Sequence, residues 1–194
     1  EEKTISDTIE SLLNLDYPKD KLEIIVVNDG STDNTKQVVE KYLDKGIKLI
    51  NKKSSGKAAS VNVALSNIKT EIFGIVDADS IVERNSVANM VHFFDNQSVG
   101  AVISLIKVRE PKTILERVQH FEYIFSAFSR KLMHAVNTLF ITPGVLTLFR
   151  TDVIKKLGGF DEENLTEDLE IAMKLRYNNY NIVIETNSLT YTRV

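Results

Sequence analysis

The chain contains no cysteine and no tryptophan among its 194 residues, and only three prolines. Without cysteine it has no disulfide bond, no thiolate zinc site and no cysteine nucleophile. Any metal ion must therefore be held by oxygen or histidine ligands. The missing cysteines agree with a reducing compartment, so we expect a cytoplasmic location, or the cytoplasmic face of a membrane if the full-length protein has membrane helices.

The sequence also lacks a long apolar run and an excess of positive charge. No stretch approaches the 18 apolar residues of a membrane span, and the opening segment 1–3 lacks the layout of a signal peptide. Lys and Arg number 24 against 27 Asp and Glu, a net charge of −3, which gives no support to a nucleic-acid partner. With 43% hydrophobic and 26% charged residues, the composition is that of a globular protein, and we expect one domain over 1–194.

Helical and strand-like patterns alternate through the first half of the chain. Apolar residues recur at helical spacing in some segments and form short β-rich runs in others. The predicted helices are 5–13, 32–43, 56–68 and 85–94, and the predicted strands are 22–27, 47–50, 72–76 and 99–106. This alternation predicts an α/β fold with a mainly parallel sheet and helices on both faces.

The second half is less regular. A long amphipathic helix is predicted over 114–135, and its apolar face is interpreted as core, although Arg117, Arg130 and Lys131 would also suit contact with a membrane surface or a partner helix. Strand-like runs at 139–141 and 145–149 flank Thr142-Pro143-Gly144, so a hairpin or bent strand is expected there. The last predicted elements are a helix from Thr166 and strands at 182–184 and 189–192.

Acidic residues follow two of the predicted strands. Ligands of open α/β sheets bind at the carboxyl ends of strands, which is where Asp29, Asp77 and Asp79 lie. In an extended segment, side chains at positions i and i+2 point to one side, so Asp77 and Asp79 would face one cation or its bound phosphate. Taken singly, each motif also has a structural explanation, because Asn-Asp-Gly favours turns and Asp79 or Ser80 suits a helix cap.

Two further motifs are ambiguous when read alone. Gly56-Lys57 does not match a P-loop, because Asn51 and Ala58 stand where that motif needs Gly and Ser or Thr. Lys57 still places a cation at a helix start, which suits a phosphate. The segment 166–168, Thr-Glu-Asp, is explained equally well by a helix cap with acids in the first turn.

Taken in order, these motifs resemble family 2 glycosyltransferases of the GT-A fold. The Thr-Glu-Asp segment is similar to that of the processive polysaccharide synthases, such as cellulose, chitin and hyaluronan synthases. The residues that carry the resemblance are Ile24–Asp33, Gly56-Lys57-Ala58 with Asn62, Val76–Asp79, Gly158-Gly159-Phe160 and Thr166-Glu167-Asp168.

The resemblance implies a donor side within about 1–106 that binds a nucleotide-sugar, by family habit a UDP-sugar. Asp29 would contact the nucleobase, Lys57 would lie beside the nucleotide, and Asp77 would hold the ribose or the diphosphate. Asp79 would ligate Mg²⁺ or Mn²⁺, which neutralises the leaving nucleoside diphosphate.

The acceptor side would lie within about 107–194. Asp168 would be the catalytic base that takes the proton of an acceptor hydroxyl, which gives direct displacement with inversion. The acceptor would be a saccharide or a lipid-linked acceptor. Glu167 would support the base, and Gly159, Phe160 and Thr166 would shape this side.

The sequence also departs from the family pattern. An apolar first strand with a Pro-x-Tyr-Asn-Glu-like segment has no counterpart here, nor has the Gln-x-x-Arg-Trp motif of processive members. We therefore expect these 194 residues alone to be weak or inactive as a transferase. A nucleotide-binding module without turnover is the alternative, and a nucleotidyltransferase is disfavoured because no Gly-rich basic loop is present.

Overall fold

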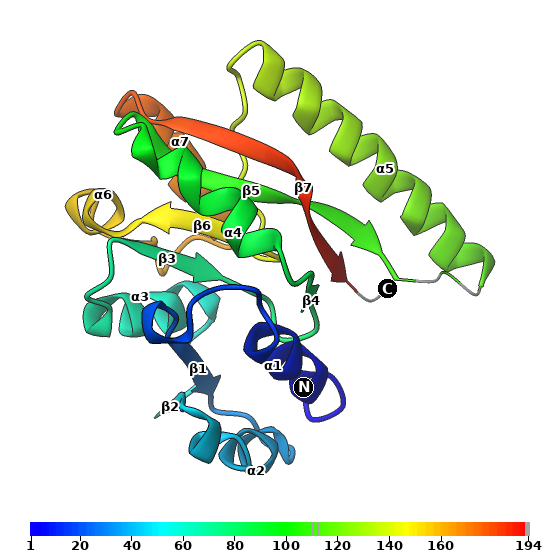
Figure 1. Ribbon diagram of the computed structural model, residues 1–194, viewed down its shortest axis with the longest axis vertical. Coiled ribbons are helices and arrows are strands. Elements are labelled where there is room, and N and C mark those ends of the chain that lie inside the picture. The colour runs from blue at the N-terminus through cyan, green and yellow to red at the C-terminus, as the bar shows by residue number, and fades with distance from the viewer. Residues whose placement is uncertain (110, 112, 193–194) are drawn as a thin grey trace.

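The computed structural model describes residues 1–109, 111 and 113–192 (Figure 1). Short 3-10 helices cover Lys19–Lys21, Leu43–Lys45 and His92–Asp95. The α-helices are α1 (Ile5–Leu13), α2 (Thr35–Glu40), α3 (Lys57–Asn67), α4 (Ser86–Val91), α5 (Ile114–Ala135), α6 (Thr151–Lys156) and α7 (Glu167–Tyr177). The strands are β1 (Ile24–Asp29), β2 (Ile47–Lys52), β3 (Ile72–Ile75), β4 (Ile81–Val82), β5 (Val99–Val108), β6 (Thr147–Arg150) and β7 (Asn181–Thr192).

The strands form two sheets, one of them parallel and the other mixed. β1 and β2 pair in parallel, and the larger sheet has the order β3-β6-β5-β7-β4. Within it β5 and β7 are parallel, whereas β6 runs antiparallel to β3 and β5, and β4 runs antiparallel to β7. The α/β class is confirmed, and the longest pairings, β1–β2 and β5–β7, are parallel, while β6 and β4 add antiparallel pairs. Sequence periodicity reports burial and not strand direction, so it did not reveal the antiparallel β6.

Helices cover both faces of the larger sheet, as predicted. Successive residues of β5 point to opposite faces. Ala101 and Ile103 pack with α3, α6 and α7 in one core cluster, while Val102 packs with α4 in another. Each is fully buried, and so are Ile171 and Leu175 on α7. The helix α7 is thereby anchored against the sheet.

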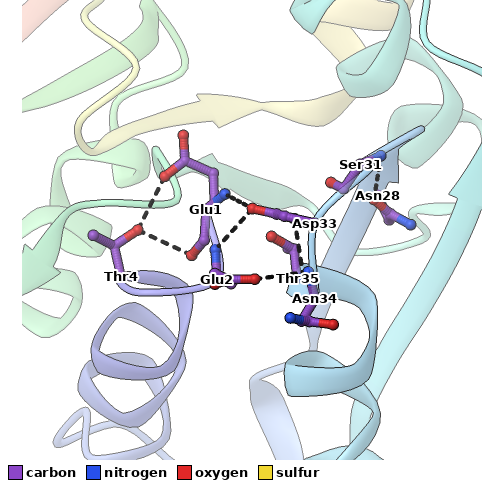
Figure 2. A network of polar contacts seen from close by, with 8 residues as sticks. All are labelled: Glu1, Glu2, Thr4, Asn28, Ser31, Asp33, Asn34 and Thr35. Carbon is purple, nitrogen blue, oxygen red and sulfur yellow. Dashed lines mark hydrogen bonds and ion pairs between the residues drawn. The ribbon is translucent and has the colours of Figure 1, made fainter.

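The small β1–β2 sheet is covered by α1 and α2 through a third apolar cluster. Polar contacts join the segment before α1 to the loop after β1, as Figure 2 shows. Asp33 accepts hydrogen bonds from the nitrogens of Glu1 and Glu2, at 2.8 and 3.3 Å, and the Glu2 carboxylate accepts from the Asn34 nitrogen at 2.8 Å. The helix start expected near Thr32 lies later in the chain, because Asn34 is the N-cap residue of α2. These contacts fix the loop that follows Asp29.

Two strand predictions differ from the structure. No strand forms at 139–141; β6 alone follows the Pro143-Gly144 turn, and it pairs with β3 and β5 rather than in a local hairpin. The two short strands predicted near the end are one strand, β7, whose register shifts opposite Ser104 and Leu105 of β5. A bulge of this kind interrupts the apolar alternation, so a single strand reads as two.

The interpretation of 114–135 as a core helix is wrong. α5 forms with a capping box between Thr113 and Glu116, yet none of its side chains is buried. It packs against β5 and β7, and Figure 1 shows it along the outside of the molecule. In the part of the chain that the structure describes, each helix is too short or too polar to cross a bilayer.

Candidate active site

Three charged side chains from distant parts of the chain meet at the start of α3. Lys57 is the first residue of that helix, Asp77 follows β3, and Glu167 is the first residue of α7. The Lys57 Nζ lies 2.5 Å from Asp77 Oδ1 and 3.4 Å from Glu167 Oε1. Burial lowers the pKa of Lys57, but the hydrogen bond and charge of Asp77 and the charge of Glu167 outweigh it, so the net pKa is raised. Lys57 is therefore a cation held between two carboxylates.

Gly144 packs directly on this ion pair, and the sequence analysis did not include it. A Cβ added at Gly144 would lie 2.8 Å from Asp77 Oδ1 and closer still to Lys57 Nζ. Only glycine leaves room for the pair in its present position. The Pro143-Gly144 dipeptide was the available signal, but it was read only as a turn.

Asp77 and Asp79 lie in a turn rather than in the extended segment that the sequence suggested. The Ser80 nitrogen donates to the Asp77 carbonyl at 3.1 Å and closes this turn, and the Ser80 hydroxyl donates to Asp79 Oδ1 at 3.3 Å. Among the described residues, no group of three or more His, Cys, Asp or Glu side chains is arranged to hold a metal ion. A cation held by Asp79 and Asp77 would therefore need further oxygens from a bound substrate or from water.

Asp29 is hydrogen-bonded to the end of β2 and to the loop that leads into α3. Its carboxylate accepts hydrogen bonds from Lys52 Nζ at 2.5 Å and from the backbone nitrogens of Ser55 and Gly56, both at 2.9 Å. The Lys52 hydrogen bond is the main reason that the pKa of Asp29 is lowered, and the two backbone donors add to it. Since Lys57 follows this loop directly, Asp29 and Asp77 are linked through one short segment.

Asp168 lies in the first turn of α7, next to Glu167. Its carboxylate accepts a hydrogen bond from the Leu169 nitrogen at 2.8 Å, and its backbone carbonyl accepts one from the Thr142 hydroxyl at 2.8 Å. The side chain of Arg130, on the inward face of α5, is close enough for its charge to interact with that of Asp168. Burial lowers the pKa of Arg130, against the charges of Tyr123 and Asp168, which favour its charged form. Sequence analysis missed Arg130 as a neighbour of Asp168 because helix 114–135 was assigned to the core.

The other residues expected on the acceptor side, Gly159, Phe160 and Thr166, lie in the segment that leads into α7. Asn62 on α3 accepts from the Phe160 nitrogen at 2.9 Å and donates to its carbonyl at 2.8 Å. Gly159 has φ +74° and lies against Asn62, while the Phe160 ring is buried on Phe149 in the core. Thr166 is the N-cap residue of α7, but its hydroxyl bonds to Asn164 instead of capping the helix. It lines a hollow of about 490 Å³ along α7.

The structure thus brings Lys57, Asp77, Glu167 and Asp168 to one region, with Asp29 connected through the 55–57 loop. A second hollow, of about 460 Å³, lies elsewhere, between His92 and His134. Neither hollow is lined by the expected donor-side residues.

Comparison with known proteins identifies the same family as the motifs. Residues 1–158 match the family described as Glycosyl transferase family 2. Poly-beta-1,6-N-acetyl-D-glucosamine synthases of Staphylococcus epidermidis and Staphylococcus aureus are 32% and 31% identical over the whole chain. The chain covers 48% of each of these proteins, so it spans about half the length of the curated relatives it matches.

Solved structures of glycosyltransferases share the fold. TarS of S. aureus, solved in complex with UDP, has a TM-score of 0.78 and 25% identity over 100% of this chain and 57% of its own. A mannosyltransferase of Pyrobaculum calidifontis, in complex with GDP-Man and Mn²⁺, has a TM-score of 0.77 and 26% identity over 98% of this chain and 53% of its own. The GT-A-like fold is confirmed by both likenesses. Since the family model matches most of its length, this chain belongs to glycosyltransferase family 2.

Proposed function

We propose that this chain binds a nucleotide-sugar, with a UDP-sugar as the favoured donor, and transfers its sugar with inversion to a hydroxyl of a saccharide or lipid-linked acceptor. The observation that carries the proposal is the meeting of Lys57 and Asp77 with the start of α7, where Glu167 and Asp168 lie. It joins the expected donor part, about 1–106, to the expected acceptor part, about 107–194. The choice of UDP is supported by TarS, which binds UDP, and by relatives that make an N-acetylglucosamine polymer.

On the donor side, we assign the nucleobase to Asp29 and the phosphates to Lys57. Asp29 accepts three hydrogen bonds and keeps spare acceptor capacity, since two carboxylate oxygens offer about four lone-pair sites. Its fixed position at the end of β1 suits a donor group on a base. Lys57 is held charged by Asp77 and Glu167, and its place at the start of α3 suits a phosphate.

The charges of the region favour a divalent cation. Two carboxylates, those of Asp77 and Glu167, meet at Lys57, and Asp79 and Asp168 lie close to them in sequence. The negative charge of these carboxylates repels a diphosphate unless a cation lies between them. Mg²⁺ is usually bound by one or two carboxylates together with substrate phosphates, and the Asp77–Asp79 turn offers that number. Asp79, with help from Asp77, would hold Mg²⁺ or Mn²⁺, which neutralises the leaving nucleoside diphosphate as a Lewis acid. The mannosyltransferase of known structure was solved with Mn²⁺.

On the acceptor side, Asp168 is proposed as the general base. Its carboxylate takes the proton of the acceptor hydroxyl while that oxygen attacks the anomeric carbon, and the bond to the diphosphate oxygen breaks with its electron pair. Glu167 and the Thr142 hydrogen bond hold the first turn of α7 in place. Gly159 and Phe160 shape the acceptor side through the conformation of the backbone below α7, where the Phe160 nitrogen is bonded to Asn62. Thr166 lines the adjoining hollow.

Calorimetric titration tests the donor site. UDP is titrated into the chain with and without Mn²⁺, and into Asp79→Asn and the control Asp44→Asn, an exposed aspartate on the 3-10 helix Leu43–Lys45. We expect Mn²⁺ to strengthen UDP binding in the chain and in Asp44→Asn but not in Asp79→Asn. Equal Mn²⁺ dependence in both variants would contradict the role of Asp79.

A second measurement separates binding from transfer. Release of UDP from UDP-GlcNAc is followed with Asp168→Asn and with the unaltered chain, and UDP binding is measured for both. A general base contributes about 10²–10⁴-fold to rate, so any transfer should fall by that factor while UDP affinity stays within about twofold. Binding without transfer in the unaltered chain would favour the nucleotide-binding module.

A further inference from the structure

One face of α5 carries polar side chains that are partly buried. They recur at three- and four-residue spacing and so share one side of the helix, and they are Gln119, Tyr123, Ser126 and Arg130. Since α5 packs on β5 and β7, its partly buried side is the one turned toward the sheet. Polar groups withdrawn from water are normally hydrogen-bonded, yet in the described part of the chain these four side chains form no hydrogen bond.

Arg130 is the charged member of this row. A guanidinium has five N–H donors and no acceptor, and it stays charged at neutral pH. Leaving such a group half-buried and unpaired is costly, so a partner for it is expected. None of its nitrogens is fully buried, which means that a ligand can still reach them. Arg130 thus presents a charged set of donors that the described residues leave free for a ligand.

The packing of α5 against the core directs Arg130 toward the start of α7. Met133, one turn after Arg130 on the same face, packs against the core cluster that contains Ile171. Asp168 stands one turn before Ile171 on α7. One turn back from this contact, therefore, Arg130 on one helix meets Asp168 on the other, in agreement with the interaction of their charges.

A second contact holds the two helices in this arrangement. Arg176, in the last turn of α7, donates to Asn137 Oδ1 at 2.9 Å, two residues beyond the end of α5. Arg130 and Asp168 each lie about two helical turns before that contact. The guanidinium is therefore held near Asp168 by the packing of the helices, with its donors still available.

The charges around Arg130 indicate the class of its ligand. The donor side has its own cation, Lys57, which pairs with Asp77 and Glu167. The charge of Arg130 interacts instead with Asp168. Because the Asp168 carboxylate repels a second anion, a neutral ligand rich in acceptor oxygens suits this position better than a phosphate. The hydroxyl and ring oxygens of a saccharide have that chemistry.

We propose that Arg130 is an acceptor-binding residue, whose guanidinium donates to two oxygens of the saccharide acceptor and holds its attacking hydroxyl against Asp168. Tyr123, two turns earlier on the same face of α5, donates from its free hydroxyl to a more distant part of the same saccharide. Orientation of the hydroxyl before proton transfer lowers the barrier to attack. The inference rests on the proposed function, since it names where the acceptor of that reaction binds.

A saccharide titration tests the assignment without requiring turnover. The probe is the β-1,6-linked trisaccharide of N-acetylglucosamine, chosen because the curated relatives are named as synthases of that polymer. Its affinity is measured by saturation-transfer NMR for the unaltered chain, for Arg130→Gln and for the control Arg117→Gln, an exposed arginine of the same helix. We expect Arg130→Gln to weaken binding about tenfold or more, and Arg117→Gln to leave it within about twofold.

Arg130→Lys separates saccharide binding from a structural role of the charge. Lysine keeps the positive charge near Asp168 but cannot offer the planar pair of donors. Thermal unfolding of Arg130→Lys should therefore match that of the unaltered protein, while its saccharide affinity stays at least about threefold lower. Tyr123→Phe, which removes only a hydroxyl, should weaken saccharide binding about threefold.

Titration of UDP with Mn²⁺ into the same variants distinguishes this inference from the proposed function. We expect Arg130→Gln to bind UDP within about twofold of the unaltered chain. A chain that binds UDP but not the trisaccharide would overturn the role of Arg130 and leave the donor site standing, and so would equal saccharide affinity in Arg130→Gln and Arg117→Gln. A tenfold loss of UDP affinity in Arg130→Gln would assign Arg130 to the donor phosphates instead. Binding of neither ligand would overturn both proposals.

Discussion

The Nζ of Lys57 and the Oδ1 of Asp77 lie 2.5 Å apart, although the two residues stand on a helix start and a strand end that are 20 positions apart. Glu167, from the other half of the chain, completes the contact at 3.4 Å. A residue of the proposed donor side and the first turn of α7, on the proposed acceptor side, are therefore in direct electrostatic contact. A substitution at Lys57 should therefore alter the electrostatic environment of both Asp77 and Glu167.

Replacement of Lys57 by Met should weaken UDP binding about tenfold or more, because a charged hydrogen-bond donor to phosphate is lost. The pair is partly exposed, with 42% of the Lys57 and 33% of the Asp77 side chain accessible. Its contribution to the free energy of unfolding should therefore be small, with a coupling of about 0.5–1 kcal/mol in a double-mutant cycle with Asp77→Asn. Calorimetry and urea unfolding measure the two quantities.

Lys36→Met is the matched control for this replacement. Lys36 forms an exposed pair with Glu40 on α2, at 3.7 Å, and has no contact with the candidate site. UDP affinity should be unchanged in this variant. A similar loss of affinity in both variants would mean that Lys57 contributes only to the overall charge of the protein.

Gly144→Ala should reduce UDP binding while it leaves stability nearly unchanged. The added Cβ meets the tip of the Lys57 side chain, which can move at little cost, but the movement breaks the ion pair with Asp77. Gly46→Ala is the control with the opposite expectation for stability and for binding. Gly46 has φ +86°, and a Cβ added there would meet no atom within 4 Å. That variant should lose about 1 kcal/mol of stability from backbone strain and keep its UDP affinity. Thermal unfolding and calorimetry of both variants test the contrast.

Much of this architecture could be predicted from the sequence, because local patterns determined it. The alternation of helices and strands predicted the α/β class, and the motifs placed Lys57, Asp77 and Asp168 in a shared site region. The short spacing from strand to acidic residue was the informative feature, since strand ends gather at one edge of a sheet. Direction within the sheet was not predictable, because the antiparallel β6 depends on a pairing with β3 about 75 residues earlier in the chain, Ile72 with Arg150.

The error at α5 has a different physical cause. Periodicity shows that a helix has an apolar face but not what that face contacts. Phe121 and Phe125 follow the pattern of core residues, and they are exposed because β5 and β7 meet the opposite side of the helix. Gly144 and Arg130 were missed for a related reason, since their importance depends on contacts made far away in the sequence.

Acid unfolding should report the environment of Asp29. Its pKa is lowered in the folded protein, chiefly by Lys52, relative to an unfolded value of about 3.9. The associated stabilisation is therefore complete above that unfolded value and is lost as the pH falls through the lower, folded value. Asp29→Asn should lower stability by about 1–2 kcal/mol at pH 7, because its amide presents donors where Lys52 and two backbone nitrogens already donate.

The difference between Asp29→Asn and the unaltered protein should shrink as the pH falls below about 4. Urea unfolding at a series of pH values measures it. Asp44→Asn, at an exposed position, should run parallel to the unaltered protein throughout. A difference that stays constant down to low pH would show that the charge of Asp29 does not stabilise the fold.

Asn62→Ala should destabilise the turn beneath α7 more than its half-buried position suggests. The Asn62 amide satisfies both the nitrogen and the carbonyl of Phe160, and it also donates to Glu162. Its removal leaves those backbone groups without partners, at a cost of about 1–3 kcal/mol. Asn67→Ala is the matched control, since Asn67 lies on the same helix and its amide donates to Val63 and Ser66 of that helix. Hydrogen exchange should rise at Phe160 in Asn62→Ala alone, and equal exchange in both variants would show that the turn is held by the buried Phe160 ring instead.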